Sequence, residues 1–236
     1  MDALMTAAAS GMKSRMESLD MLANNIANTN TTGFKADREF YNLYQEELPF
    51  VENRWTDFAQ GTVIPTQNQL DLALSGKGFF ALNGPDGVVY TRNGGFRLSK
   101  QNQLVSADGY TLRNAADQGK PMTVDPDQAI SVDRQGVITQ AGQLIGRLQL
   151  DRAPDIATDV AKLGASYFAL IPDRKSLGPV TDTEVLQGHL EQSNVPIADS
   201  TVRLVNIMRQ FEMLQRALTL GSQMNKAAIE QVARVS

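Results

Sequence analysis

The chain has 236 residues, of which 42% are hydrophobic and 20% charged, so we expect a folded protein with one large domain or two modest ones. A net charge of -4 gives no reason to expect nucleic acid or an anionic membrane as a partner. The absence of cysteine excludes disulfides, thiolate metal sites and cysteine nucleophiles, and no run approaches the roughly 20 apolar residues of a membrane helix.

The first residues do not have the pattern of a cleaved secretory signal. Asp2 stands where a basic segment is expected, and Lys13, Arg15 and Glu17 interrupt the Ala-rich start before an apolar core can form. We therefore expect a protein that is cytoplasmic or is exported without a cleaved signal.

Apolar residues near the N-terminus follow a heptad spacing. They recur at alternating steps of four and three residues, at Met5, Ala9, Met12, Met16, Leu19, Ala23 and Ile26. This is the spacing of a coiled-coil seam, although a single stripe of this kind can also be the core face of an ordinary amphipathic helix. The pattern predicts a helix that pairs with another helix.

Residues 24–35 are rich in short polar side chains, with four Asn, three Thr and one Gly. Such side chains compete for backbone hydrogen bonds and tolerate left-handed conformations. The segment therefore predicts the end of the helix and a structured turn, with an ordinary polar loop as the alternative. Residues 1–35 form the first expected domain.

The middle of the chain has β character. We expect an extended linker over residues 36–68 and a β-rich domain over residues 69–180. Turn pairs such as Asn93-Gly94, Asp108-Gly109 and Ala141-Gly142 separate short apolar runs, and no helical pattern lies between them. This favours an antiparallel meander or a small barrel.

Residues 181–236 predict a linker and a second long helix. Asp199, Ser200 and Thr201 supply capping side chains. A second heptad seam follows, at Leu204, Ile207, Phe211, Leu214, Leu218, Gly221, Asn225, Ala228, Val232 and Val235. We predict an α+β fold in which the N- and C-terminal helices pair as a coiled coil, with Asn225 fixing the register.

The sequence offers little to catalysis. His189 is the only histidine, and a lone His is a poor metal site. Asp125 and Asp127 flank Pro126, which is typical of a solvated turn, although two carboxylates could act in sugar hydrolysis. We assign no catalytic, cofactor-binding or metal-binding residue, and expect no cofactor.

Four blocks of sequence, in order, resemble the flagellar rod and hook proteins. The first is Ala-Asn-Asn-Ile-Ala-Asn-Thr-Asn-Thr-Thr-Gly-Phe-Lys, which ends at Lys35. The others are residues 57–61 with 70–80, residues 90–96 with 104–110, and residues 190–195 with 208–217. Gln69, Pro196 and the pair Leu218-Thr219 depart from the usual family pattern.

The resemblance implies a structural subunit of the bacterial flagellar basal-body rod, which crosses the periplasm and transmits torque. It implies export by the flagellar export apparatus, and assembly with copies of itself and neighbouring rod proteins. No nucleic acid or small-molecule substrate is implied. The short middle domain and residues 209–213 favour the proximal-rod type, with a distal-rod or hook-type subunit as the alternative.

Two alternatives come from other classes of protein: a carbohydrate-active enzyme that uses Asp125 and Asp127, and a β-rich binding module with an oligomerisation tail. Under the rod interpretation, the residues expected at assembly contacts are Met5, Met12, Met16, Leu19, Asn24, Asn25, Ile26, Asn28, Gly33, Phe34, Leu204, Ile207, Phe211, Leu214, Leu218, Gly221, Asn225, Ala228 and Val232.

Overall fold

A computed structural model describes residues 2–41, 51–152, 159–164, 166–171, 178–180 and 182–235. The chain divides into two compact units. The helical unit consists of Met1–Ala27, Asp37–Trp55 and Pro196–Ser236, and the β unit consists of Asn28–Ala36 and Thr56–Val195. The Asn-rich turn therefore belongs to the β unit, and the chain passes between the units four times.

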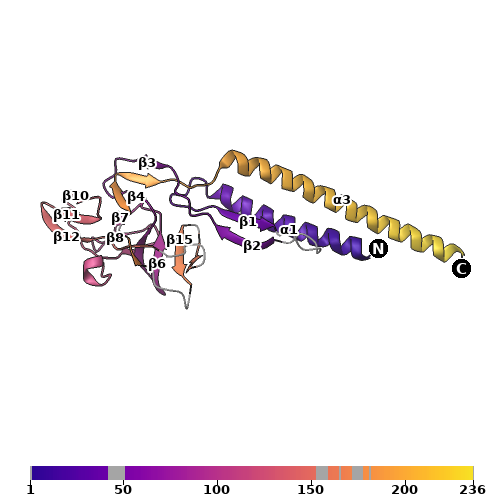
Figure 1. Ribbon diagram of the computed structural model, residues 1–236, viewed down its shortest axis with the longest axis horizontal. Helices are drawn as coiled ribbons and strands as arrows, with labels where there is room; N and C mark the ends of the chain where they lie inside the picture. Colours follow the sequence, from indigo (N-terminus) through magenta and orange to yellow (C-terminus); the bar gives the residue numbers. More distant parts are fainter. Residues whose placement is uncertain are drawn as a thin grey trace. The chain divides into compact units, whose positions relative to one another are not determined.

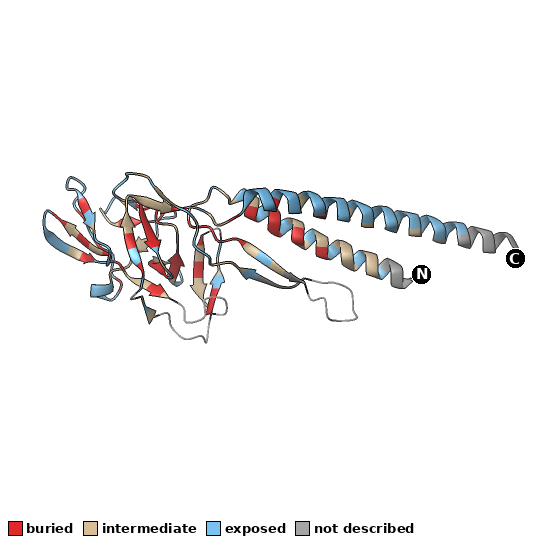
Figure 2. Ribbon diagram, turned by 45° about the horizontal axis from the view of Figure 1, so that its top comes forward, coloured by how far each residue is buried: buried red, intermediate tan, exposed pale blue. Residues whose placement is uncertain are grey.

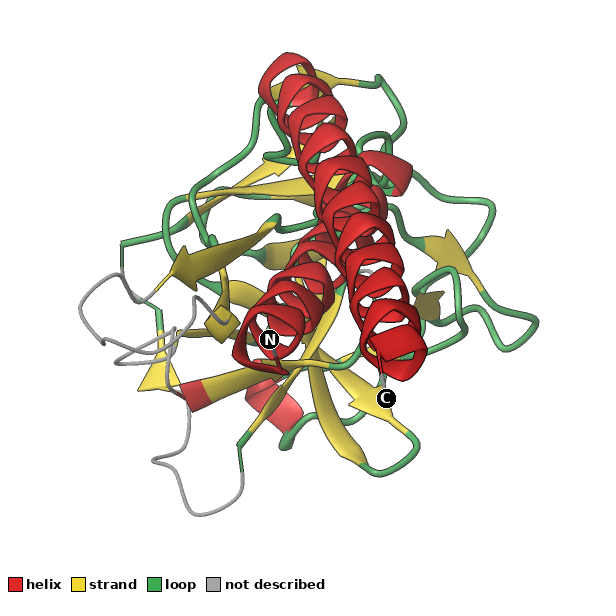
Figure 3. Ribbon diagram, turned by 90° about the vertical axis from the view of Figure 1, so that its right-hand side faces the viewer, coloured by secondary structure: helices red, strands yellow, loops and turns green. Residues whose placement is uncertain are grey.

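The helical unit contains α1 (Asp2–Ala27) and α3 (Ile197–Val235), which lie side by side with the chain termini at the same end (Figures 1 and 3). It also contains a two-stranded sheet of β1 (Asp37–Tyr41) and β2 (Val51–Thr56). Within the described part of the chain, no helix is both long enough and apolar enough to span a membrane.

The β unit is built from short strands whose described pairings are all antiparallel. Most belong to one sheet with the order β14-β15-β6-β5-β9-β8-β7, in which β13 also pairs with β5. The first strands are β3 (Val63–Pro65), β4 (Leu72–Ser75), β5 (Phe79–Gly84), β6 (Gly87–Thr91), β7 (Arg97–Leu98), β8 (Leu104–Val105) and β9 (Thr111–Leu112).

A 3-10 turn, η1 (Ala115–Asp117), follows β9. The remaining strands are β10 (Ile130–Val132), β11 (Val137–Gln140), β12 (Gln143–Arg147), β13 (Leu150–Arg152), β14 (Val160–Lys162), β15 (Tyr167–Leu170), β16 (Gly178–Pro179), β17 (Glu184–Gln187) and β18 (His189–Glu191). Residues 36–68, which the sequence assigned to a linker, include β1, β2 and β3.

The turn pairs Ala141-Gly142 and Asn93-Gly94 have different physical causes. Ala141 and Gly142 have φ of 47° and 79°, and they join β11 to β12 in the left-handed conformations that a two-residue hairpin turn needs. Gly94 has a different reason to be glycine, because an added Cβ would lie 1.5 Å from the carbonyl oxygen of Leu72. Asn93-Gly94 therefore marks a close approach of two backbones.

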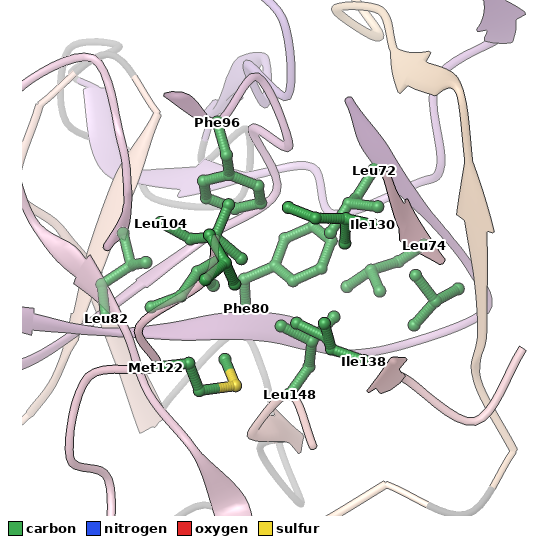
Figure 4. Close-up of a cluster of buried hydrophobic side chains, with 13 residues drawn as sticks. Leu72, Leu74, Phe80, Leu82, Phe96, Leu104, Met122, Ile130, Ile138 and Leu148 are labelled. Carbon is green, nitrogen blue, oxygen red and sulfur yellow. The ribbon is translucent and has the colours of Figure 1, made fainter. Parts of the chain in front are cut away.

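Strand β5 is buried on both faces. Phe80 and Leu82 point into the main apolar cluster, where the Phe80 ring lies among Leu72, Leu148 and their neighbours (Figure 4). Phe79 and Ala81 alternate with them and enter a second cluster. A strand covered on both faces is continuously apolar rather than alternating, which explains the run Phe-Phe-Ala-Leu.

The α+β class and the strand-rich middle fit this structure, but the predicted coiled coil of the termini is wrong. Met16, which was expected in the seam of α1, has 53% of its surface exposed, whereas Ser14 and Ser18 are buried. The reason is that α1 packs against two elements, α3 and β1. At about 100° per residue, Ser14 and Ser18 each project roughly 160° from Met16. The buried face of α1 therefore lies on another side of the helix from the predicted seam and includes polar residues that contact β1.

The main cluster gives a direct test of the fold. Phe80 is fully buried with its ring edge-on to Phe96, so Phe80→Ala should lower the free energy of unfolding by about 3–5 kcal/mol. Leu144→Ala, at a side chain that is 71% exposed, should change it by no more than about 0.5 kcal/mol. Urea denaturation followed by circular dichroism measures both, and equal losses would contradict the assigned core.

Candidate assembly site

Helix α3 turns one stripe of residues toward α1. From residue 201 to residue 224, the side chains that are not exposed are Leu204, Ile207, Phe211, Leu214, Leu218 and Gly221. Leu204 and Ile207 pack with Met21 and Leu22 of α1, and a Cβ added at Gly11 would lie 3.4 Å from Leu214. The side chains of Asn225, Ala228 and Val232 lie outside the described residues.

The predicted apolar seam of α1 is not the buried face of the helix. Met12, Leu19 and Ile26 are half-buried, whereas Met16 and Asn24 are exposed. The side chain of Met5 lies outside the described residues. A role of these residues, or of the α3 stripe, in contacts between copies stays a prediction.

Asn25 acts as a polar partner for a strand. Its side chain is buried, its Nδ2 donates to the Asp37 carbonyl at 2.8 Å, and its Oδ1 accepts from the Asp37 N–H at 3.0 Å. Ser18 donates a hydrogen bond to the carboxylate of Glu39 at 2.8 Å. Polar side chains of α1 thus form hydrogen bonds with β1, and a search for apolar seams does not find residues of this kind.

The other side of α3 carries apolar residues that nothing in the described chain covers. Val202, Met213, Leu220 and Met224 keep 60%, 61%, 60% and 69% of their surface exposed. At about 100° per residue they project within roughly 40° of one another, and roughly 135° from the stripe that faces α1. Figure 2 shows α3 exposed along most of its described length. The helix thus carries apolar side chains on two faces, the second of which it shares with the exposed Arg209.

The Asn-rich turn packs closely against the rest of the β unit. Thr31 donates from its backbone to the Asn28 carbonyl at 3.1 Å, which tightens the turn. Gly33 has φ of 68°, and an added Cβ would lie 2.3 Å from the backbone nitrogen of Asn93. Thr32 Oγ1 donates to Asn93 Oδ1 at 2.7 Å. Only glycine fits at residue 33, because both the left-handed backbone and the close approach require it.

Phe34 anchors the same turn and is fully buried with Ala36 and Val195. The ammonium of Lys162 lies 4.0 Å from the centre of the Phe34 ring and donates to the Lys35 carbonyl at 2.8 Å. An aromatic ring and a cation at this separation attract each other. Phe34 is therefore a packing residue within the β unit, while a part in contacts with other copies remains untested.

The next residue, Lys35, belongs to a buried cluster of three charges. Its Nζ lies 2.6 Å from Glu191 Oε1, and both side chains have no exposed surface. Arg92 Nη1 lies 3.2 Å from the other carboxylate oxygen, with 3% of its side chain exposed. Lys35 and Glu191 are 156 positions apart in the chain, and Arg92 and Glu191 are 99 positions apart.

Every charged group in this cluster has further partners. The N–H of Gly61 donates to Glu191 Oε1 at 2.9 Å, and Lys35 Nζ donates to the Ala59 carbonyl at 2.7 Å. Arg92 donates to the carbonyl of Gly76 and lies 5.6 Å from the Phe79 ring. Burial lowers the pKa of both Lys35 and Arg92, and the charge of Glu191 raises it only in part.

Asn194 joins the same segments by neutral hydrogen bonds. Its Oδ1 accepts from the Ala36 N–H at 2.8 Å, and its Nδ2 donates to the carbonyls of Asp57 at 2.7 Å and Ala59 at 2.9 Å. The ionic cluster and Asn194 together connect residues 33–36, 57–61 and 191–194. Our sequence interpretation missed this arrangement, although Lys35, Arg92 and Glu191 all stand within the blocks that resemble the family.

The residues considered for catalysis have ordinary structural roles. Asp125 Oδ1 accepts from the Asp127 N–H at 3.0 Å, and both residues are exposed, as expected of a turn. Nδ1 of His189 lies 2.8 Å from the Gln187 carbonyl. The described residues contain no group of acidic or His side chains arranged to hold a metal ion.

Comparison with known proteins identifies the family. Three family profiles match: "Flagella basal body rod protein" over residues 5–35, "Flagellar hook protein FlgE/F/G D1 domain" over 73–140, and "Flagellar basal body rod FlgEFG protein C-terminal" over 186–231. The flagellar basal-body rod protein FlgF of Caulobacter vibrioides is 31% identical, over 92% of this chain and 93% of that protein. The chain belongs to the flagellar basal-body rod protein family.

Other relatives agree. FlgF of Mesorhizobium japonicum is 32% identical over 82% of this chain and 83% of that protein, and FlgG of Agrobacterium fabrum is 30% identical over 92% and 94%. The resemblance inferred from the four sequence blocks is thus confirmed. The chain is a structural subunit of the flagellar basal body, and its family is not enzymatic.

The docked turn predicts different costs at two glycines with left-handed backbones. Gly109→Ala should lower the free energy of unfolding by about 1–2 kcal/mol, because φ is 88° but nothing lies within 4 Å of the new Cβ. Gly33→Ala adds a clash with the Asn93 backbone, so its loss should reach about 3 kcal/mol or more. Thermal and urea denaturation measure the difference, and a smaller loss at Gly33 would contradict the docking.

The ionic cluster predicts a large loss when its anion is neutralised. Glu191→Gln leaves two buried cations without a counter-charge and should lower the free energy of unfolding by about 3–5 kcal/mol. Asp182→Asn is the control. The side chains of Arg152 and Asp182 are 40% and 60% exposed, so their ion pair should contribute no more than about 1 kcal/mol to the free energy of unfolding. Similar values for the two variants in urea denaturation would show that Glu191 is not buried between cations.

Proposed function

We propose that this rod-family subunit assembles with other rod subunits through the face of α3 that carries Val202, Met213, Leu220 and Met224. The proposal rests on the exposed apolar surface of that face. A side chain of this kind contributes roughly 1.5–3 kcal/mol when it is fully buried, so four of them on one helix face favour a partner. The opposite stripe of α3 is already used by α1 within the chain.

The partners we infer are copies of this chain and neighbouring rod proteins. In such an assembly the subunits form the shaft that crosses the periplasm and transmits torque. We also infer delivery by the flagellar export apparatus. Membership of the rod family supports these inferences, and the predicted contacts in the Asn-rich turn add Asn28 and Gly33 to the same hypothesis.

The alignments favour the FlgF type, which corresponds to the proximal-rod assignment made from the sequence. The alignment with Caulobacter FlgF spans 231 positions and includes 92% of this chain, which is about 217 of its 236 residues. About 14 positions of that alignment therefore lie opposite gaps in this chain. The alignment with Agrobacterium FlgG spans 265 positions for the same share, which leaves about 48. This chain is therefore closer in length to the Caulobacter FlgF than to the Agrobacterium FlgG.

Charge placed on the exposed face tests assembly. The double variant Leu220→Glu with Met224→Glu should fold with an unchanged melting temperature, because both side chains are at least 60% exposed. In a host strain that lacks its own copy of the gene, this variant should fail to restore swimming and should be absent from purified basal bodies, because burying two carboxylates opposes association.

A matched control is Gln215→Glu, which adds charge at an exposed position on a different side of α3. This variant should restore swimming, and immunoblots should show equal amounts of all chains in the cells. Normal swimming by the double variant would overturn the proposed use of this face.

A further inference from the structure

The buried charges of the β unit lie beside a strand pair whose own side chains do little to fix its register. β3 and β18 pair His189 with Pro65, Leu190 with Ile64, and Glu191 with Val63. Of these six side chains, Glu191 alone is buried. A strand pair with little apolar burial specifies its register weakly.

The position of β18 itself is fixed by the strand before it. β17 pairs with β4 over four residues, and Val185 lies in the main apolar cluster with Leu72 and Leu74. Gly188 alone separates β17 from β18. The apolar core therefore fixes β18, but it does not fix where β3 and the residues just before it lie along β18.

Glu191 contacts those residues directly. Its Oε1 accepts from the N–H of Gly61, and its ion pair holds Lys35, whose ammonium also bonds the Ala59 carbonyl. A slip of β3 by two residues would keep every side chain on its face, but would move Gly61 by about 7 Å relative to the carboxylate. The carboxylate could not follow, because Arg92 holds its other oxygen.

The charges are poorly suited to supplying stability. Three ions lose their water, and two cations share one anion, so burial opposes the cluster more than the ion pairs favour it. Replacing a buried ion cluster by apolar residues of similar volume is often neutral or stabilising, and the best supported use of buried polar groups is to fix register.

We infer that Glu191, held by Lys35 and Arg92, determines the register of β3 on β18. The cluster selects one arrangement of the segments before β3 over arrangements displaced by two residues. This inference concerns the free chain and does not depend on the proposed assembly.

Engineered disulfides read the register directly, because the natural chain has no cysteine. Ile64→Cys with Leu190→Cys joins the pair that is opposite in the native register, at a Cα separation that a disulfide spans. Thr62→Cys or Thr66→Cys, each with Leu190→Cys, reports a slip of two residues in one direction or the other. The otherwise wild-type chain should form only the native disulfide under mild oxidation.

The decisive variant replaces the cluster by Lys35→Met, Arg92→Met and Glu191→Leu. Its melting temperature should equal or exceed that of the wild type, while one of the slipped disulfides should form at least tenfold more than in the wild-type background. Glu191→Gln should do the opposite. It leaves two buried cations without a counter-charge, so it should lower the melting temperature. Its side-chain carbonyl can still accept the Gly61 hydrogen bond, so the native disulfide alone should form.

Two results would overturn the inference. One is a triple variant that forms only the native disulfide, which would show that other contacts fix the register. The other is a triple variant that melts well below the wild type, which would show that the charges supply stability instead. The triple variant decides the matter even if Glu191→Gln does not fold.

Discussion

The arrangement of the β unit depends on one buried carboxylate. Glu191 accepts hydrogen bonds from a lysine, an arginine and a backbone amide that come from three distant parts of the chain. Its own carbonyl also accepts from the N–H of Gly33 at 2.8 Å. A carboxylate with no exposed surface is tolerated only when all its partners are in place, so these segments must be positioned together.

This constraint lies close in sequence to the places where the chain changes units. Lys35 precedes β1 by two residues, Gly61 follows the end of β2 by five, and Glu191 precedes α3 by six. The apolar core around Phe80 stabilises the strands, and the ionic cluster and Asn194 place the segments that lead to the helices. The helices themselves bury little: α3 has apolar residues on two faces, and only one faces α1. That division suits a subunit whose β unit is complete within one chain and whose helix still offers a surface to a neighbour.

Much of this organisation could be predicted from the sequence, because it depends on local patterns. The inward stripe of α3 follows from spacing alone, and the turn at Ala141-Gly142 follows from the conformations that glycine allows. The family followed from four blocks in order. The seam of α1 could not be predicted in the same way. Its buried face contains Ser18 and Asn25, whose partners on β1 are distant in sequence, and a search for apolar periodicity passes over such residues. The same limit hid the contact of Lys35 with Glu191, since no local pattern links residues 156 positions apart.

Native-state hydrogen exchange tests the central role of Glu191 most directly. The amides of Gly33 and Gly61 donate to the main-chain and side-chain oxygens of this residue. If the cluster is part of the cooperative core, both amides should exchange with the same opening free energy as the amides of β5. Exchange of Gly33 and Gly61 through a local opening, while β5 stays protected, would contradict the account.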